Sequence, residues 1–406
     1  MKILLLTSEF FPATGGIGTY AREIACAAVK LGAQVTVVAP DYARDSSTED
    51  RALPFEVQRF RGGLHSMREL PSKIRLARKH VALENYDVVH AADWPFFIPV
   101  ALSRGRTPAR LLVTVHGTEI NETQTRIKRT AIRAAGVFRS RTTIAANSRY
   151  TRDLFQQRFA IDPQRVKAIP LGVSEFWFGD RASRAAVRET YRLAPDDIVM
   201  TTVARLTRRK GHLMTLAALS SLPDSVRKRV IWLVVGPPGE SEYVEEFRRL
   251  AQASDCDIRL LGPLPDREIR DIYGASDFFC LTGVPDPTGR VEGFGLVYLE
   301  AAAGCLPSVA TAIGGVPDAV RANETGILVE PSVNAIAQAI ADLAERHDMR
   351  ASMAERALAH ARALSWERCA TETYQLFPRR KQNEQDERSS PEGLSRHEQM
   401  VPVAGH

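Results

Sequence analysis

The sequence predicts an α/β protein made of two doubly wound, Rossmann-like domains that face each other across a cleft. Its 406 residues are enough for two domains that each bury a core. Short β-branched or leucine-rich runs alternate with amphipathic stretches, which is typical of parallel strands covered by helices on both faces. Ligands of such sheets bind beyond the carboxyl ends of the strands, so we expect the site in the cleft between the domains.

The expected strands form two series along the chain. The first series falls at 2–8, 33–40, 87–93, 110–117 and 142–148. The second series falls at 198–204, 230–236, 258–262, 278–283 and 306–311. We place the first domain at 1–175, the second at 176–359, and a last helical segment at 360–377 that packs back on the first domain. Residues 378–406 are polar and charged, so we expect them to form a disordered tail.

Composition and charge exclude several classes of protein. Hydrophobic residues make up 44%, charged residues 25%, and the net charge is +6, as in ordinary globular domains. The five cysteines include no C-x-x-C pair, which argues against a disulfide framework or a zinc site and for a reducing compartment. The N-terminal apolar run is too short for a signal peptide, and no stretch approaches the ~20 apolar residues of a membrane span. We expect a cytoplasmic protein with at most peripheral membrane contact and no nucleic-acid partner.

A glycine-rich loop follows the first expected strand. Gly15, Gly16 and Gly18 bring backbone N–H groups close to a ligand ahead of a helix N-terminus, which suits an anion. Gly16-x-Gly18-x-x-Ala21 also matches a dinucleotide fingerprint, with Asp41 near the end of the second strand. That match is weak, because about seven residues separate the strand end from Gly15, whereas the fingerprint needs an immediate turn. A simple turn is the remaining alternative.

Two polar residues of the first half stand at strand ends. His116 precedes a glycine in TVHGTE, and its position at the cleft makes it a candidate site residue, with a purely structural histidine as the alternative. Asp93 ends the preceding strand in HAADWP. Its carboxylate can orient a hydroxyl, and the alternative is that it caps a helix.

A cationic turn opens the second half of the chain. Arg205 ends a strand and Lys210 follows beside Gly211 in VARLTRRKGH. Two cations at the mouth of a sheet suit a diphosphate, with arginine as a fork and lysine as a point charge, and the alternative is a solvated basic turn. Asp255 and Asp257 form a D-x-D, but their loop precedes its strand and lies on the wrong side of the sheet, so we expect no metal there.

Glu292 and Glu300 lie in an otherwise glycine-rich and apolar stretch, GRVEGFGLVYLEAAAG. Buried acids are costly without partners, so both are expected to bind something polar. We predict a helix from about Leu296, with Glu292 ahead of it and Glu300 about one turn inside. The free N–H groups near Leu296 and Val297 can take a phosphate. Glu292 can then bind sugar hydroxyls and Glu300 a ribose, and a further glycine-rich turn at 310–320 lies over the same cleft.

Together these motifs resemble those of retaining glycosyltransferases of the GT-B fold, in glycosyltransferase family 4 (group 1). Glu292 and Glu300 match the family's E-x7-E signature, and Arg205 and Lys210 match its R-x-x-x-x-K-G donor motif. The G-G-I-G loop and His116 also correspond. The resemblance runs from the N-terminus to the last expected helix, and the combination of motifs is specific although each alone is modest.

The resemblance implies transfer of a hexose, with mannose favoured, from a GDP- or UDP-linked sugar to a glycan or lipid-linked acceptor in cell-envelope or exopolysaccharide synthesis. It implies no metal and no further cofactor, since cations and a helix N-terminus meet the diphosphate charge, and a front-face substitution without an enzymic nucleophile. The second domain binds the donor and the first the acceptor. The implied catalytic residues are His116, Glu292, Arg205 and Lys210. The implied donor-binding residues are Gly16, Arg205, Lys210, Gly293, Phe294, Gly295, Leu296, Val297 and Glu300, and the acceptor-side residues are Gly15, Gly18 and Asp93.

The sequence departs from the family pattern at two places. The hinge segment reads PLGVS, with Leu171 and Ser174, where members often carry P-N-G-V-D. The loop GVPDPTGRVEG is longer than the common P-S-x-x-E-G form and looks like that of members that mannosylate lipid acceptors.

Three other functions compete with glycosyl transfer. An NAD-dependent oxidoreductase would rest on the weak dinucleotide fingerprint and would leave the cations and the glutamate pair unexplained. A catalytically silent GT-B binding protein is disfavoured by the intact motif set. A nucleotide-sugar epimerase of similar architecture is disfavoured because E-x7-E with R-x-x-x-x-K-G indicates a transferase.

Two basic segments of the first half make an anionic membrane surface a candidate partner. The segment 125–141 carries Arg126, Lys128, Arg129, Arg133, Arg139 and Arg141, interleaved with Ile127, Ile132, Ala135 and Phe138. The segment 72–80 adds Lys73, Arg75, Arg78 and Lys79. The alternative is a solvated helix face. Because both segments lie in the expected acceptor domain, we expect an amphipathic basic helix that attaches the protein to the inner face of the plasma membrane.

Overall fold

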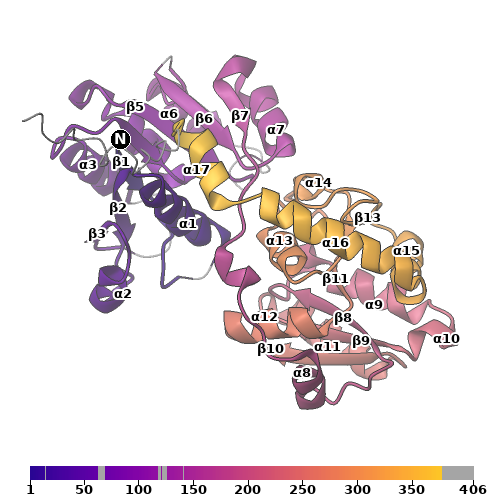
Figure 1. Cartoon of the computed structure of the whole chain (residues 1–406). Coiled ribbons are helices and arrows are strands. Elements are labelled where there is room, and N and C mark those ends of the chain that lie inside the picture. Colours follow the sequence, from indigo (N-terminus) through magenta and orange to yellow (C-terminus); the bar gives the residue numbers. More distant parts are fainter. Residues whose placement is uncertain (14, 63–68, 118–119, 121–125, 140, 377–406) are drawn as a thin grey trace, which may run out of the picture.

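The computed structural model describes residues 1–13, 15–62, 69–117, 120, 126–139 and 141–376. Figure 1 shows two α/β domains, the first from indigo to magenta and the second from magenta to orange, joined by two crossing segments. The predicted fold class is confirmed. The tail predicted at 378–406 lies outside the described residues.

The first domain is built on a parallel sheet of seven strands in the order β3-β2-β1-β4-β5-β6-β7. The strands are β1 (Lys2–Leu6), β2 (Gln34–Pro40), β3 (Glu56–Phe60), β4 (Val88–Ala91), β5 (Arg110–Val115), β6 (Thr142–Ala146) and β7 (Val166–Ala168). Ile3 and Leu5 pack into one apolar cluster, while Leu4 and Leu6 pack into another. Because alternate side chains of a strand face opposite ways, both faces of this sheet are covered.

The second domain repeats this plan with a parallel sheet of six strands in the order β10-β9-β8-β11-β12-β13. The strands are β8 (Ile198–Val203), β9 (Val230–Val235), β10 (Asp257–Gly262), β11 (Phe278–Leu281), β12 (Ser308–Thr311) and β13 (Gly326–Val329). Trp232 and Val234 of β9 pack on one face, and Ile231 and Leu233 pack on the other. Continuous apolar runs in the sequence therefore correspond to strands buried on two sides.

Helices connect the strands of both sheets. Those described in the first domain are α1 (Gly16–Lys30), α2 (Ser47–Arg51), α3 (Leu70–His80), α4 (Phe97–Ala101), α6 (Arg126–Ala134) and α7 (Arg149–Phe159). The second domain contains α8 (Arg184–Thr190), α9 (His212–Ser220), α10 (Asp224–Arg227), α11 (Ser241–Ala253), α12 (Asp266–Ala275), α13 (Leu296–Ala303), α14 (Val316–Ala319), α15 (Val333–Glu345) and α16 (His347–Ala363). The chain ends with α17 (Trp366–Tyr374), and short 3-10 turns include η2 (Trp94–Phe96), η5 (Glu175–Phe178) and η6 (Arg208–Lys210). Of these described helices, none is long and apolar enough to cross a bilayer.

All ten predicted strand segments contain a strand, and three strands lie outside them. These three, β3, β7 and β13, are each at the edge of their sheet. The side chains of β3 in EVQRF are exposed or only partly buried, and β7 has three residues, VKA. An edge strand has only one hydrogen-bonded neighbour, so it needs no continuous apolar run and gives a weak sequence pattern.

Helix α17 returns to the first domain after α16 has packed on α13 of the second domain. It lies along α1, as Figure 1 shows in yellow and indigo. The hydroxyl of Tyr374 is 2.8 Å from Nδ1 of His90, and Arg110 donates to the carbonyl of Tyr374 at 3.0 Å. The crossing itself is held by Val173, whose N–H donates to the carbonyl of Leu364 at 2.9 Å. The two crossings meet at this place and form the hinge between the domains.

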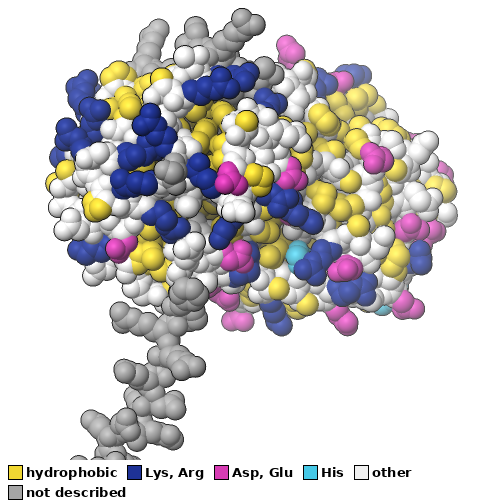
Figure 2. Space-filling view, turned by 90° about the horizontal axis from the view of Figure 1, so that it is seen from above, with side chains coloured by type: hydrophobic (Ala, Val, Ile, Leu, Met, Phe, Trp, Pro, Cys, Tyr) yellow, Lys and Arg dark blue, Asp and Glu magenta, His cyan; other side chains and the backbone are white. Residues whose placement is uncertain are grey.

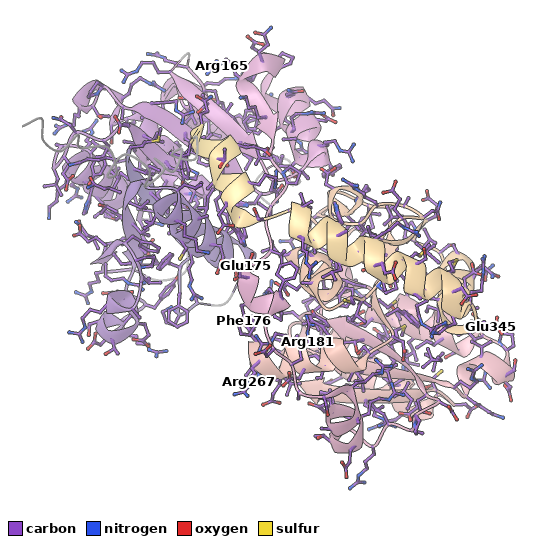
Figure 3. All side chains as sticks on the ribbon, viewed as in Figure 1. Arg165, Glu175, Phe176, Arg181, Arg267 and Glu345 are labelled. Atoms are coloured by element: carbon purple, nitrogen blue, oxygen red, sulfur yellow. The ribbon has the colours of Figure 1, made fainter. Side chains whose placement is uncertain are left out.

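The forward crossing is anchored to the second domain by arginines. Figure 3 labels Glu175, Phe176 and Arg181 along this connection. Arg181 donates to the carbonyl of Ala303 at 2.8 Å, at the end of α13, and Arg270 donates to the carbonyl of Phe176 at 2.8 Å. The hinge is therefore attached directly to the helix that carries Glu300.

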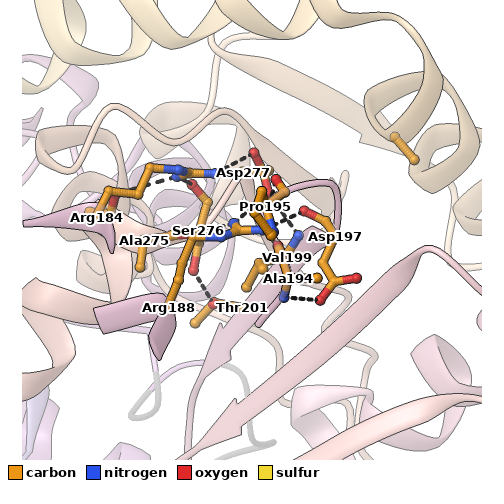
Figure 4. A network of polar contacts seen from close by, with 12 residues as sticks. Arg184, Arg188, Ala194, Pro195, Asp197, Val199, Thr201, Ala275, Ser276 and Asp277 are labelled. Atoms are coloured by element: carbon orange, nitrogen blue, oxygen red, sulfur yellow. Dashed lines mark hydrogen bonds and ion pairs between the residues drawn. The ribbon is translucent and has the colours of Figure 1, made fainter. Parts of the chain in front are cut away.

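A buried arginine, Arg188, fixes the first helix of the second domain to the sheet (Figure 4). Its guanidinium donates to the carbonyls of Ala194 and Asp197 at 2.5 and 2.8 Å and lies 3.6 Å from Asp277. Asp277 also accepts from Arg184 at 2.8 Å and from the N–H of Val199 at 2.8 Å. Because protein groups surround Arg188 and Asp277, this network stabilises the fold and offers nothing to a ligand.

Candidate active site

The carboxyl ends of the two sheets face a cleft of about 560 Å³. From the first domain it is lined by Glu9, Gly15, Gly16, Tyr42, His116 and Asn147. From the second domain it is lined by Arg205, Arg209, Lys210, Glu292, Gly293, Phe294, Gly295, Leu296, Val297 and Glu300. Of the residues predicted from the sequence, the structure brings all to this cleft except Gly18 and Asp93.

The glycine-rich loop lies at the start of α1. A Cβ atom on Gly15 would lie 3.0 Å from Oε2 of Glu9, and one on Gly18 would lie 3.3 Å from the carbonyl of Ala13. A Cβ atom on Gly16 would meet nothing within 4 Å, so this position is open to the cleft. Gly18 lines the adjoining cavity instead.

The cationic turn faces the loop from the second domain. It follows β8 and ends at Gly211, whose φ of +73° and close approach to the carbonyl of Thr282 leave no room for a side chain. Lys210 Nζ lies 2.5 Å from Oε2 of Glu292, and Arg209 Nη1 lies 3.4 Å from the same oxygen. The side chain of Arg205 is exposed and makes no hydrogen bond or ion pair within the part of the chain that the structure describes.

Glu292 is ionised because of these cations. Burial acts to raise the pKa of its carboxyl, but Lys210 and Arg209 outweigh burial and hold that pKa below its ordinary value. The carboxylate thus has two protein partners before any ligand enters. From the sequence, Glu292 is expected to have a ligand as its partner. The structure shows that Lys210 and Arg209 are partners within the protein.

Glu300 has the opposite environment. It lies in α13, and its carboxylate makes no hydrogen bond or ion pair to another described residue. Burial, with smaller contributions from Asp266 and Glu23, raises its pKa to about 8. A second cavity of about 550 Å³ shares Glu300 and Leu296 with the cleft and extends to Asp266. Glu300 is therefore a neutral hydrogen-bonding group at the junction of two cavities.

The N-terminus of α13 is available to an anion. Its N-cap residue, Gly295, has a φ of +88° and no side chain that could cap the helix. Gly295, Leu296 and Val297 all line the cleft. The first N–H groups of the helix therefore lie at the cleft close to the cations of the β8 turn, and both attract negative charge.

His116 is held in a neutral form at the first-domain wall. Its Nε2 lies 2.9 Å from the carbonyl oxygen of Ala92, which can only accept, so Nε2 carries the proton. Burial lowers the pKa of the imidazole. The ring contacts Tyr20 edge-on at 4.8 Å between centroids. His116 is therefore a fixed, uncharged side chain facing the second domain.

Asp93 holds the end of β1. Its Oδ2 accepts from the N–H and hydroxyl of Ser8 at 2.6 and 2.7 Å and from the hydroxyl of Thr7 at 3.1 Å. It makes no side-chain cap to η2, so it is not the helix cap considered from the sequence. Burial raises the pKa of the carboxyl. Asp93 therefore fixes Thr7 and Ser8, the two residues that precede Glu9 in this loop.

The cleft residues missed from the sequence include Glu9, Tyr42, Asn147 and Arg209. Asn147 directly follows β6 and Glu9 comes shortly after β1, so the strand-end rule that selected His116 also applies to them. Asn147 donates from Nδ2 to the carbonyl of His116 at 3.0 Å. Arg209 adjoins Lys210 in the RRK triplet, and only the fold shows that it faces Glu292.

Two family models cover most of the chain. Residues 14–175 match Glycosyltransferase Family 4, and residues 183–360 match Glycosyl transferases group 1. A D-inositol 3-phosphate glycosyltransferase of Actinosynnema mirum is 30% identical over 87% of this chain and 89% of its own. A GDP-mannose-dependent alpha-(1-6)-phosphatidylinositol monomannoside mannosyltransferase of Mycobacterium tuberculosis is 29% identical over 87% of this chain and 91% of its own.

Solved structures share the fold. A glycosyltransferase from Rickettsia africae has a TM-score of 0.76 at 20% identity, covering 92% of this chain and 97% of its own. Anabaena HepE in complex with UDP has a TM-score of 0.74 at 22% identity, covering 92% of this chain and 99% of its own.

Proposed function

The chain belongs to the group 1 glycosyltransferases of glycosyltransferase family 4, and on this premise we propose that it transfers mannose from GDP-mannose to a lipid-linked or glycan acceptor with retention of configuration. Glycosyl transfer follows from membership of the family. The choice of GDP-mannose is supported by the mannosyltransferase relatives, which are described as GDP-mannose-dependent. The role in cell-envelope or exopolysaccharide synthesis is part of the proposal.

The observation that carries the proposal is the Lys210–Glu292–Arg209 cluster beside the open N-terminus of α13. A diphosphate that approaches this helix meets Lys210, Arg205 and free N–H groups, which together stabilise the charge of a leaving group. Lys210 then shifts from Glu292 to the phosphate, and Glu292 becomes available to the hydroxyls of the sugar. Glu300, one turn further, hydrogen-bonds the ribose.

The bond changes need no nucleophile from the protein. The acceptor hydroxyl enters from the first-domain side, near His116, and its oxygen forms a bond to C1 of the sugar. The bond between C1 and the phosphate oxygen breaks on the same face, and the hydroxyl proton leaves with the departing phosphate. The protein's contribution is to orient the two substrates and to stabilise the diphosphate.

The geometry disfavours an NAD-dependent oxidoreductase. β1 ends at Leu6 and α1 begins at Gly16, so the glycines do not form the immediate turn that a dinucleotide fingerprint needs. That function also leaves the cations and Glu292 without a role. An epimerase or a silent binding protein would bind a nucleotide at the same site, but neither would transfer the sugar to an acceptor.

A thermal-shift series with GDP, UDP, ADP and NAD tests the proposal. We expect GDP to raise the melting temperature most, because at equal concentration a ligand that binds the folded state more tightly stabilises it more. Lys210→Ala should abolish the shift. Arg208→Ala is the matched control, since it removes the same charge from the same turn and its side chain contacts Glu246 and Tyr243 instead. A shift by NAD alone would contradict the assignment. Transfer of mannose from GDP-mannose to acceptors in extracts, detected by mass spectrometry, completes the test.

The basic segments of the first domain support membrane attachment by charge. Figure 2 shows Lys and Arg side chains gathered at the left of this face, over the first domain. The described basic side chains of these segments that are exposed are Arg75, Arg78, Lys79, Arg129, Arg133, Arg139 and Arg141. The side chains of 126–128 lie outside the described residues. We propose that this surface binds anionic lipid while the acceptor enters the cleft.

One detail of each predicted basic segment needs correction. Lys73 is buried, with 2% of its surface exposed, because it pairs with Glu69 at 3.1 Å and lies over the ring of Phe96. Ile132 is buried in the core of the first domain, and Phe138 packs against Phe155. The apolar side of this segment is thus used by the fold, so attachment would depend on charge alone.

Co-sedimentation with vesicles tests the attachment. We expect binding to anionic vesicles at low salt, loss of binding at high salt, and no binding to neutral vesicles. Replacing both Arg129 and Arg133 by Glu should abolish binding to anionic vesicles. Replacing Arg267 and Arg356 of the second domain by Glu should leave that binding unchanged. Binding that ignores anionic lipid would contradict the membrane role and favour a soluble acceptor.

A further inference from the structure

We infer that Arg149 and Asp318 form an interdomain clasp that holds the cleft closed, and that both act as positioning residues for the transfer. The inference goes beyond the proposed function, and only its kinetic readout rests on that function. Neither residue lines the cleft. Their effect on chemistry must therefore pass through the relative placement of the domains.

The clasp joins a helix of the first domain to a carboxylate of the second. Arg149 is the first residue of α7, and Asp318 lies in α14. One carboxylate oxygen of Asp318 accepts from the backbone N–H of Arg149, and the other accepts from its guanidinium Nε. The N–H groups of a first helical turn have no partner within their own helix and carry a partial positive charge. Asp318 supplies a missing N-terminal partner to α7 from across the domain boundary.

Burial shows that Asp318 depends on the closed arrangement. Its side chain is only 5% exposed, although Arg149 is 66% exposed. In the closed arrangement this carboxylate is shielded from water, and the N–H and guanidinium of Arg149 replace its hydration, so the two bonds hold the domains together at this point. Ser148, at the N-cap of α7, accepts from the N–H of Thr151 at 3.1 Å, which fixes the turn that presents Arg149.

The contact between the two domains beside the clasp includes residues of the candidate site. A Cβ atom on Gly293 would lie 2.1 Å from the carbonyl oxygen of His116, and one on Gly315 would lie 2.7 Å from the hydroxyl of Ser148. Gly315 also donates from its N–H to the carbonyl of Glu292 at 2.9 Å. Closure at Arg149 and Asp318 therefore sets how His116 meets Glu292 and Gly293.

Four variants separate the clasp from a local role. Asp318→Ala removes both bonds, whereas Arg149→Ala keeps the backbone bond, so the first should have the larger effect. Arg149→Lys should restore part of the loss through its charge. Arg158→Ala is the matched control, because it removes the same charge from the opposite end of α7 and should leave closure and rate unchanged.

The measurements are the radius of gyration by small-angle X-ray scattering in saturating GDP, the affinity for GDP, and transfer kinetics. We expect Asp318→Ala to have a larger radius than the wild type, a melting temperature lowered only by the loss of the α7 partner, GDP affinity within about twofold, and kcat/KM lower by about tenfold to about 100-fold, as expected for misplaced groups. An unchanged radius overturns the clasp, and so does a loss of GDP affinity that equals the loss of rate. If the wild type transfers no sugar, the proposed function fails while the scattering result still decides the clasp.

Discussion

The two ends of the donor cleft place the same side chain in opposite conditions. Glu292 and Glu300 are eight residues apart in sequence, and burial acts to raise the pKa of both carboxyls. At Glu292 two cations reverse that effect, and the group is ionised. At Glu300 nearby acidic groups add to it, and the pKa reaches about 8.

Burial alone does not decide whether a carboxyl group is ionised, because its charged partners can outweigh burial. An ionised Glu292 has Lys210 as a partner without any ligand, and under the proposed function a diphosphate competes for that lysine. A neutral Glu300 gains its partners only when a ligand enters, so it lowers the stability of the empty protein at high pH. Under the proposed function, the Glu292 end serves the charged diphosphate and the Glu300 end serves hydroxyl groups.

The largest effect on turnover is expected from removing Lys210, the main cation beside Glu292. Lys210→Ala removes the main partner of Glu292 and a cation of the diphosphate site, so kcat should fall by about 100-fold to about 1000-fold. Arg205→Ala should also impair transfer more than folding. Steady-state kinetics with Arg208→Ala as control measures this. Retained transfer in a folded Lys210→Ala protein would contradict the assignment.

A smaller effect is expected at Glu292 itself. Glu292→Ala should depress turnover while nucleotide binding is largely kept, because this carboxylate is assigned to the sugar. Since Lys210 and Glu292 contact each other, the double variant should lose less than the sum of the two single losses. Strict additivity in a double-mutant cycle would show that the two residues act separately.

At the other end, Glu300→Ala should weaken nucleotide binding by about 1–3 kcal/mol, the usual cost of deleting a buried hydrogen-bonding partner. Isothermal titration with GDP measures the change. Turnover at saturating donor should change less than in Glu292→Ala. Equal losses of affinity in the two alanine variants would remove the distinction between a sugar end and a ribose end.

The pH dependence of stability sharpens the comparison. Glu300 has a folded pKa of about 8, above that of the unfolded chain, so its stability contribution is present at low pH and is lost as pH rises through 8. The melting temperature of Glu300→Gln relative to the wild type should therefore increase from pH 5 to pH 9 without nucleotide. Glu292 has a lowered pKa, so its contribution is lost only in acid, and Glu292→Gln should show no such slope. Parallel slopes would contradict the two environments.

The smallest effect is expected from metal removal. Because protein cations and α13 are assigned to the diphosphate, transfer should persist in EDTA. Loss of activity in chelator that magnesium or manganese restores would overturn this part of the mechanism and would require a further cation at the charged end.

Much of this site was predictable because parallel sheets gather strand ends at one edge. That rule selected His116, Arg205 and Lys210, and it also reaches Glu9 and Asn147, which were not selected. Helix periodicity placed Glu300 one turn inside α13. Lys73 shows the opposite case, since a charged residue in a basic run reads as solvated until its helix packs on Phe96.

From the amino-acid sequence alone, ten of the thirteen described strands, the start of α13 and most of the motif residues that line the cleft could be predicted, because these depend on neighbours within a few positions of the chain. Only the tertiary structure decided that Glu292 is paired while Glu300 is not, that the apolar side of the basic helix faces the core, and that Asp318 caps α7 from the other domain. Each of these depends on groups far apart in sequence, such as Arg149 and Asp318. Their separation is set by how two domains fold and close, and no local pattern records it.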